Sequence, residues 1–160
     1  MGRVLAVDTG TRRVGLAVTD PLGMISSPLP GIPFESESRL AKSLLDLCAS
    51  LHVDTVVIGL PVSADGSEGE GCARARRIRE RILAAGMACE LWDESWSSRD
   101  AADALRTAGT RGRAAKKRLD SVAASLILRD WMESRPASGG ERPGQRDGRP
   151  GPQDGQGTGR

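Results

Sequence analysis

Two short apolar runs open the chain, and a turn separates them. Residues 4–7 are apolar and are followed at once by Asp8, and a second apolar run spans residues 14–18. The intervening residues begin with Thr-Gly-Thr, a composition typical of turns. The pattern predicts a β-hairpin with strands at 3–8 and 14–20. Because a bare buried carboxylate is costly, we expect Asp8 to be paired or to bind a cation.

Farther along, the pattern alternates between helices and strands. Apolar residues that recur every three or four positions predict helices, and short apolar or β-branched runs between turns predict strands. Further strands are expected at 24–27, 55–58 and 87–92, and helices at 38–51, 72–85, 97–108 and 119–133. The prolines and glycine of 28–33 are expected to end regular structure after the third strand, and 109–117 is expected to be a basic loop.

This order of elements predicts the fold class. It indicates an α/β sheet with an antiparallel hairpin at one side and parallel strands beside it. Residues 134–160 are rich in Gly, Pro, Arg, Asp and Gln and almost devoid of apolar side chains. Such a segment buries too little apolar surface to offset the entropy of folding. We therefore expect one folded domain over 1–133 and a disordered tail over 134–160.

Composition and charge narrow the function classes. Only 2% of the residues are aromatic, so a surface that reads single strands with stacked rings is not expected. The cysteines lack paired spacing, which is typical of reduced thiols in a cytosolic protein, and His52 is expected to be a helix cap or a surface residue. The sequence shows neither a signal peptide nor an apolar stretch long enough for a membrane, so a cytoplasmic location is expected. The net charge of +2 arises after residue 133, so any argument for nucleic-acid binding depends on local clusters.

Acidic residues stand at the ends of predicted elements. Asp8 ends the first strand, Asp93 and Glu94 follow the last strand, and Asp120 lies in the first turn of the last predicted helix. The carboxyl ends of parallel strands meet at one edge of a sheet, where α/β proteins gather their ligand sites. Carboxylates that converge there repel one another unless a cation lies among them, and oxygen ligands without His or Cys suit Mg²⁺ or Mn²⁺. Two such ions about 4 Å apart can activate water and stabilise the leaving oxygen of a phosphodiester.

Each of these acids also has a structural interpretation. Asp120 could favour a helix N-terminus through the helix dipole, and Asp8 could hold the turn through its own backbone. Asp93 or Glu94 could lie in a loop or pair with an arginine. For any single acid, the structural interpretation is at least as good as the metal-site hypothesis. Taken together, acids at the same kind of position favour a metal site.

Basic residues directly precede Asp120. They are Arg111, Arg113, Lys116, Lys117 and Arg118. Beside metal-binding acids they could hold a nucleic-acid backbone, whereas by themselves they are equally typical of a solvated loop. The arginines of 74–81 are interpreted as a mainly exposed helix face, and the Gly-rich loop 59–71 as either a mobile substrate flap or a plain connector.

Four stretches of the chain resemble a known family. They read VDTGTRRVGLAV (7–18), IGLPVSADGSEG (58–69), WDESWSS (92–98) and KKRLDSVAASLIL (116–128). In this order they resemble the YqgF/RuvX family of pre-16S ribosomal RNA nucleases, which is related to Holliday-junction resolvases of the RNase H-like fold. The resemblance covers residues 3 to about 133 and leaves the tail outside it.

The resemblance implies a fold and a site. The fold is an RNase H-like mixed five-stranded sheet, with three antiparallel strands followed by parallel strands and flanking helices. The family's metal-binding acids correspond to Asp8, Glu94 and Asp120, and Arg12 stands where the family usually has Lys. Ser95 replaces the usual Arg and Trp96 the usual Leu, and both changes bear on how the substrate is held.

The function expected from these observations is a cytoplasmic, metal-dependent endonuclease in ribosome biogenesis. It would use Mg²⁺ or Mn²⁺ to process the 5′ end of precursor 16S rRNA, with Arg12 and the basic residues of 111–118 holding phosphates. The alternatives are a Holliday-junction resolvase in DNA recombination and a non-catalytic RNA- or ribosome-binding factor. The expected partners are structured RNA or branched DNA, with the ribosome as a further candidate and no membrane. A monomer or weak homodimer is expected, whereas symmetric cutting by a resolvase needs a dimer.

Overall fold

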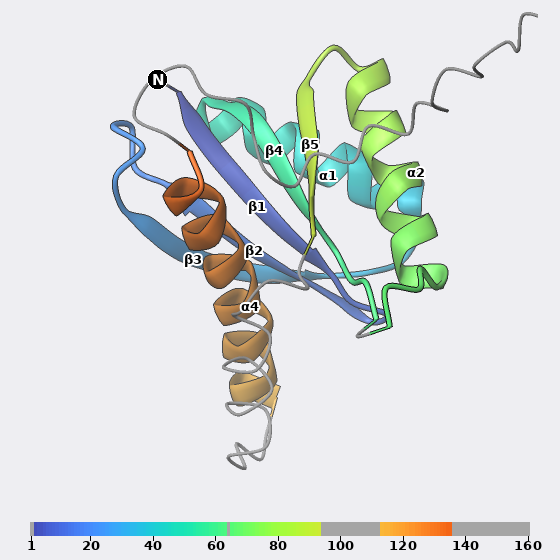
Figure 1. Ribbon diagram of the computed structural model, residues 1–160. Coiled ribbons are helices and arrows are strands. Elements are labelled where there is room, and N and C mark those ends of the chain that lie inside the picture. Colours follow the sequence, from blue (N-terminus) through green and yellow to red (C-terminus); the bar gives the residue numbers. More distant parts are fainter. Residues whose placement is uncertain (1, 64, 94–112, 136–160) are drawn as a thin grey trace, which may run out of the picture.

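The computed structural model describes residues 2–63, 65–93 and 113–135, with side chains from Val122 onward in the last range. It contains a mixed five-stranded sheet in the order β3-β2-β1-β4-β5, with helices on both faces (Figure 1). The elements are β1 (Arg3–Thr9), β2 (Arg13–Thr19), β3 (Ser26–Pro33), α1 (Glu37–Leu51), β4 (Val53–Leu60), α2 (Glu70–Ala84), β5 (Ala88–Asp93) and α4 (Arg113–Glu133). The predicted α/β class is confirmed.

The pairing of the strands also matches the prediction. β1 and β2 form an antiparallel hairpin, β3 continues antiparallel to β2, and β4 lies parallel to both β1 and β5. Apolar residues fill both faces of β1 and β4, as expected for strands at the centre of a sheet with helices on each side. The parallel strands bring several carboxyl ends to one edge of the sheet.

The third strand is longer than the sequence pattern predicts. The prolines and glycine of 28–33 were expected to end regular structure, but β3 continues to Pro33. β3 is an edge strand that pairs with β2 alone, so a residue without a backbone N–H is tolerated on its outer side. The same prolines discourage another chain from adding to this edge.

The last helix begins earlier than predicted. α4 starts at Arg113, whereas a loop was expected up to residue 117 and a helix from 119. Asp120 therefore lies about two turns inside the helix and not in its first turn. Because the helix dipole acts mainly within the first turn, it no longer accounts for an acid at this position. The predicted helix at 97–108 lies outside the described residues, as does the part of the predicted tail from 136 onward.

Each face of the sheet has its own hydrophobic core. The core under α1 and α2 includes fully buried residues from β1, β4 and both helices, namely Leu5, Val7, Leu44, Ile58, Ile78 and Ile82. The core under α4 consists of Val4, Ala6, Ala17, Val57, Ala124, Ile127, Leu128 and Trp131. Alanines from β1, β2 and α4 meet in this second core, so the helix backbone can approach the sheet closely.

The end of α1 confirms the expectation for His52. This residue is the C-cap in a left-handed conformation with φ of 56°, and its backbone N–H donates to the carbonyl of Cys48. At the other end, Ser36 Oγ accepts a hydrogen bond from the backbone N–H of Arg39 at 3.2 Å. All three cysteines are buried and free. Each helix within the described ranges is too short or too polar to cross a bilayer.

Candidate functional site

The carboxyl ends of β1, β4 and β5 lie at one edge of the sheet. The register pairs Val7 with Ile58, and Ile58 in turn with Leu91. Asp8 follows Val7 directly, and Asp93 pairs with Leu60 at the end of the neighbouring strands. The structure thus brings two of the four predicted acids to the same edge, as the sequence pattern led us to expect.

Asp8 belongs to the α4 face of the sheet. Val4 and Ala6 contribute to the core under α4, and the alternation of side chains along β1 places Asp8 on this same face. Asp8 is half-buried and lies opposite Gly15 of β2. The residue across the hairpin from Asp8 is therefore a glycine, so no side chain of β2 stands directly opposite the carboxylate.

Asp93 lies on the opposite face. Cys89 and Leu91 pack in the core under α1 and α2, and the alternation along β5 gives Asp93 the same side. Asp93 also lies near enough to α2 for its charge to act on the Cys72 thiol. Burial raises the pKa of this thiol most, and the charge of Glu68 and, more weakly, that of Asp93 raise it further. Asp93 is therefore directed away from Asp8, while Glu94 lies outside the described residues.

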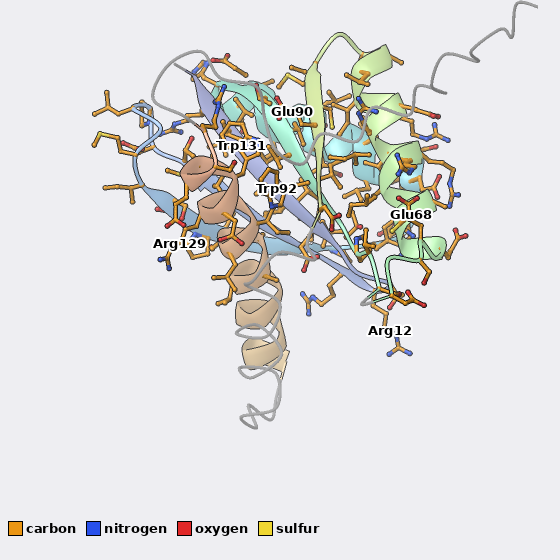
Figure 2. The ribbon with its side chains drawn as sticks, viewed as in Figure 1. Arg12, Glu68, Glu90, Trp92, Arg129 and Trp131 are labelled. Atoms are coloured by element: carbon orange, nitrogen blue, oxygen red, sulfur yellow. The ribbon has the colours of Figure 1, made fainter. Side chains whose placement is uncertain are left out.

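The backbone of α4 leads from the core toward the same edge. Trp131, near the end of α4, donates from Nε1 to Glu90 Oε2 at 3.1 Å, and Trp92 packs partly against this core (Figure 2). Ala124, two turns earlier, is fully buried in the core that includes Ala6. Asp120 precedes Ala124 by four residues, so its backbone lies one turn closer to the helix N-terminus.

The turn that follows Asp8 is held by several contacts. The backbone N–H of Gly10 donates to the carbonyl of Arg13 at 3.0 Å, and that of Phe34 donates to the carbonyl of Arg12 at 2.9 Å. Arg74 Nη1 donates to the carbonyl of Gly10 at 3.1 Å, and its guanidinium lies 4.7 Å from the centre of the Phe34 ring. A Cβ at Gly10 would lie only 2.5 Å from the Arg13 carbonyl oxygen, so the turn requires glycine.

Sequence reasoning missed the role of Arg74. We interpreted the arginines of 74–81 as a mainly exposed face, yet Arg74 is half-buried and contacts a turn 64 residues earlier in the chain. Nothing in the local pattern distinguishes it from the other arginines of this helix. Arg12, by contrast, is exposed at the tip of the hairpin (Figure 2), where a solvent-accessible phosphate could reach it.

Two of the other arginines of α2 form ion pairs. Arg76 Nη2 contacts Glu68 Oε1 at 2.7 Å, and Arg77 Nη2 contacts Glu37 at 2.8 Å and Glu70 at 2.6 Å. The hydrogen bond from Arg77 holds the pKa of Glu37 below its usual range. These pairs balance much of the positive charge of the helix, so this face is poorly suited to attract a phosphate backbone.

The loop before α2 is ordered by its own hydrogen bonds. The N–H of Ser63 donates to the carbonyl of Ser67 at 3.0 Å, and the N–H of Ser67 donates to Asp65 Oδ1 at 2.9 Å. Hydrogen bonds from the side chain and then from the backbone of Ser67 lower the pKa of Asp65. Gly66 adopts a φ of +81°, a conformation that side chains disfavour. Of the two interpretations of this loop, these contacts favour the connector in its described part.

The donor chemistry at the edge fits a hard divalent cation. Within the described ranges no three Asp, Glu, His or Cys side chains gather into a ligand set. Asp8 offers carboxylate oxygens, which suit Mg²⁺ or Mn²⁺. The side chains of the other two proposed ligands, Glu94 and Asp120, are not among those described. The assignment of all three acids as metal ligands therefore stays a prediction.

The phosphate-binding role of the basic residues at 111–118 also stays a prediction. Arg111 lies outside the described residues, whereas the backbone of Arg113, Lys116, Lys117 and Arg118 forms the start of α4. The helix replaces the loop that was expected over 113–117. Basic residues there come from the same segment as Asp120 and precede it within about two helical turns.

Comparisons with known proteins identify the family. Residues 2–134 match the RuvX family, described as Holliday junction resolvase. A relative from Chloroflexus aggregans, named "Putative pre-16S rRNA nuclease", is 36% identical over 134 residues, which cover 82% of this chain and 94% of the relative. A relative of the same name from Streptomyces coelicolor is 36% identical over 141 residues, which cover 86% and 84% of the two chains.

A solved structure supports the fold. The RuvC structure from Thermus thermophilus matches with a TM-score of 0.50 and 13% identity, covering 82% of this chain and 96% of that chain. Together with the mixed sheet, this likeness confirms the predicted RNase H-like fold. Resolvases and rRNA nucleases both hydrolyse phosphodiester bonds, so the predicted enzyme class is confirmed at the level of the family. The chain belongs to the RuvX family of nucleases.

Proposed function

We propose that this protein is a divalent-metal-dependent endonuclease that processes the 5′ end of precursor 16S rRNA. Asp8, Glu94 and Asp120 would hold Mg²⁺ or Mn²⁺, and the names of its relatives support the choice of substrate. Arg12 and the basic residues at 111–118 would hold the phosphate backbone. This role places the protein in the cytoplasm, with precursor rRNA and the assembling ribosome as partners.

The observation that carries this proposal is the shared position of Asp8 and Asp120. Asp8 lies on the face that α4 covers, at the edge where the parallel strands end. The backbone of Asp120 lies one helical turn before Ala124, which packs in this core. Backbone segments more than a hundred positions apart in the sequence, each with one of these acids, thus belong to the same layer. Such convergence favours a metal site over separate structural roles for the acids.

The side of the sheet also supports Glu94 over its neighbour. Asp93 lies on the α2 face, so it is directed away from Asp8. In an extended chain the next residue takes the opposite side. Of the two adjacent acids, Glu94 is therefore the better candidate to act with Asp8.

In the proposed reaction, the bound ion and the protein have different roles. A divalent ion held by Asp8, Glu94 and Asp120 would activate a water and stabilise the leaving oxygen of a phosphodiester. The protein positions the metal ligands and the substrate strand. Asp8 would offer its oxygens, and the contacts of Arg74 with Gly10 and Phe34 hold the turn that follows it. Arg12 at the hairpin tip would orient the substrate strand.

Cleavage assays on two substrates test this function. The purified protein is incubated with a precursor 16S rRNA fragment and, separately, with a synthetic four-way DNA junction, each with Mg²⁺, Mn²⁺ or EDTA. We expect cleavage of the rRNA near the mature 5′ end with either metal and none in EDTA. Cleavage that persists in EDTA would contradict the metal site, and binding of the rRNA without cleavage would identify a non-catalytic binding factor.

A junction resolvase is the second candidate function. The description of the matching family as a Holliday junction resolvase favours it. A resolvase cuts two strands symmetrically and therefore acts as a dimer. Paired, symmetric nicks in the four-way junction, together with a dimer in sedimentation, would favour this candidate over rRNA processing.

A further inference from the structure

Arg13 lies on the same face of the sheet as Asp8. It is the first residue of β2, in which Val14, Leu16 and Val18 pack in the core under α1 and α2. Alternation along the strand therefore gives Arg13 the α4 face. Asp8 pairs with Gly15, so Arg13 is the diagonal neighbour of Asp8 across the hairpin. Diagonal neighbours are about 7–8 Å apart, a distance that a long side chain can span.

The guanidinium of Arg13 is incompletely satisfied. Its Nε is buried and has no hydrogen-bond partner among the described residues. Buried donors without a partner are uncommon because each loses its bond to water and gains none in return. Arginine also keeps its positive charge at any ordinary pH. A half-buried charged group with an unused donor thus stands beside the acid of the candidate site.

Two neighbouring arginines show that this arrangement is not a general property of the hairpin. Arg3 is also half-buried at the start of a strand, but its Nη1 donates to the carbonyl of Leu51 at 3.3 Å. Arg12 is exposed at the tip of the turn. Arg13 alone among these three combines burial at the carboxyl edge with an unused donor.

We propose that Arg13 binds a phosphate of the nucleic-acid substrate beside Asp8. A phosphate that approaches carboxylates is repelled, and a guanidinium on the same face offsets that repulsion. The planar fork of arginine suits two oxygens of one phosphate. This assignment rests on the proposed function, because it assigns a phosphate to the site that Asp8 helps to form. Arg13 thus places the substrate strand, while Arg12 meets the same strand farther out.

Binding measurements without metal test the assignment independently of cleavage. The probes are a fluorescently labelled RNA hairpin and a labelled four-way DNA junction, each titrated in EDTA by anisotropy over about 50–200 mM salt. We expect Arg13→Gln to raise the Kd of the preferred probe about tenfold and to reduce the slope of log Kd against log salt by about one phosphate contact. Arg13→Lys should restore the slope, because the charge remains, but only part of the affinity, because the fork is lost.

Arg3→Gln is the matched control, since it removes a half-buried strand arginine from the opposite end of β1. It should leave the Kd and the salt slope unchanged, even where thermal melting shows a loss of stability. An Arg13→Gln variant that binds as tightly as the wild type, or an Arg3→Gln variant that weakens binding equally, would overturn the assignment. So would failure of Arg13→Lys to restore the slope.

Binding and cleavage measured on the wild type and on Arg13→Gln distinguish a failure of the phosphate contact from a failure of the proposed function. Wild-type protein that binds the probes with an Arg13-dependent Kd, yet cleaves neither with Mg²⁺ nor with Mn²⁺, would contradict the nuclease function and support the phosphate contact. If the wild type cleaves the RNA, and Arg13→Gln binds and cleaves it equally well, the nuclease function is supported and the phosphate contact of Arg13 is contradicted. Wild-type protein that binds neither probe would overturn the phosphate contact.

Discussion

At the scale of single residues, the sharpest test of the site compares Asp8 and Glu94, the proposed metal ligands, with Asp93, the acid next to Glu94. Asp8→Asn and Glu94→Gln should each abolish cleavage, because an amide keeps the shape of the side chain but loses the charge that holds a divalent ion. Asp93→Asn should retain cleavage, because Asp93 lies on the other face of the sheet. Cleavage rates at saturating Mg²⁺ check this prediction. Loss of activity in Asp93→Asn with retention in Glu94→Gln would contradict it.

The stability of the same variants distinguishes a ligand from a structural acid. Mg²⁺ or Mn²⁺ that binds only the folded state should raise the melting temperature of the wild type, and Asp8→Asn should lose this rise. Without metal, Asp8→Asn should be as stable as the wild type or slightly more so, because it relieves repulsion between carboxylates. A structural acid would instead cost about 1–3 kcal/mol by leaving its partner unpaired. Thermal melts with and without metal decide between the two.

The buried thiols predict how stability depends on pH. Burial raises the pKa of Cys89 from 9.0 to about 12 and that of Cys48 from 9.0 to about 11. Between pH 9 and these values the folded state holds protons that the unfolded chain has released, so the free energy of unfolding falls as the pH rises. Urea denaturation at increasing pH should show this fall, and it should be smaller in Cys89→Val. Equal pH dependence in wild type and variant would contradict the prediction.

At the scale of elements, α2 supports the turn that carries the candidate site. Arg74→Ala removes a hydrogen bond to Gly10 and the contact with Phe34, and should lower the free energy of unfolding by about 1–2 kcal/mol. Cleavage should also slow, because the turn after Asp8 loosens. Arg74→Lys should recover part of both. Arg81→Ala on the exposed side of α2 is the control, and equal losses in the two alanine variants would contradict a special role for Arg74.

At the scale of the whole molecule, we expect the folded domain to extend to Arg135. The sequence predicts a boundary after residue 133, but Ser134 Oγ donates to the carbonyl of Trp131 at 2.8 Å, and the Arg135 guanidinium lies 4.4 Å from the Trp131 ring centre. Truncation after Arg135 should leave the melting temperature unchanged, since the remaining residues are almost devoid of apolar side chains. Truncation after Glu133 should lower it. A large fall in the melting temperature of the variant truncated after Arg135 would show that residues beyond 135 pack on the domain.

The sequence by itself determined the core of the sheet and the helices that cover it. Apolar periodicity depends on local spacing, so it located β1, β2, β4, β5, α1 and α2 closely, together with the cap at His52. The order of the elements then indicated the mixed sheet. The position of Asp8 after an apolar run also placed an acid at the carboxyl edge, because parallel strands end on the same side.

Only the tertiary structure decided the features that depend on distant neighbours. The prolines of β3 are compatible with a strand because it lies at an edge, which no local pattern reveals. The sides taken by Asp8 and Asp93 follow from which core each strand face packs against, and the contact of Arg74 with Gly10 joins positions 64 residues apart. Packing of α4 on the sheet likewise brings position 120 toward the Asp8 face. Side-chain identity supplies the chemistry, but the packing of distant segments decides which groups can act together.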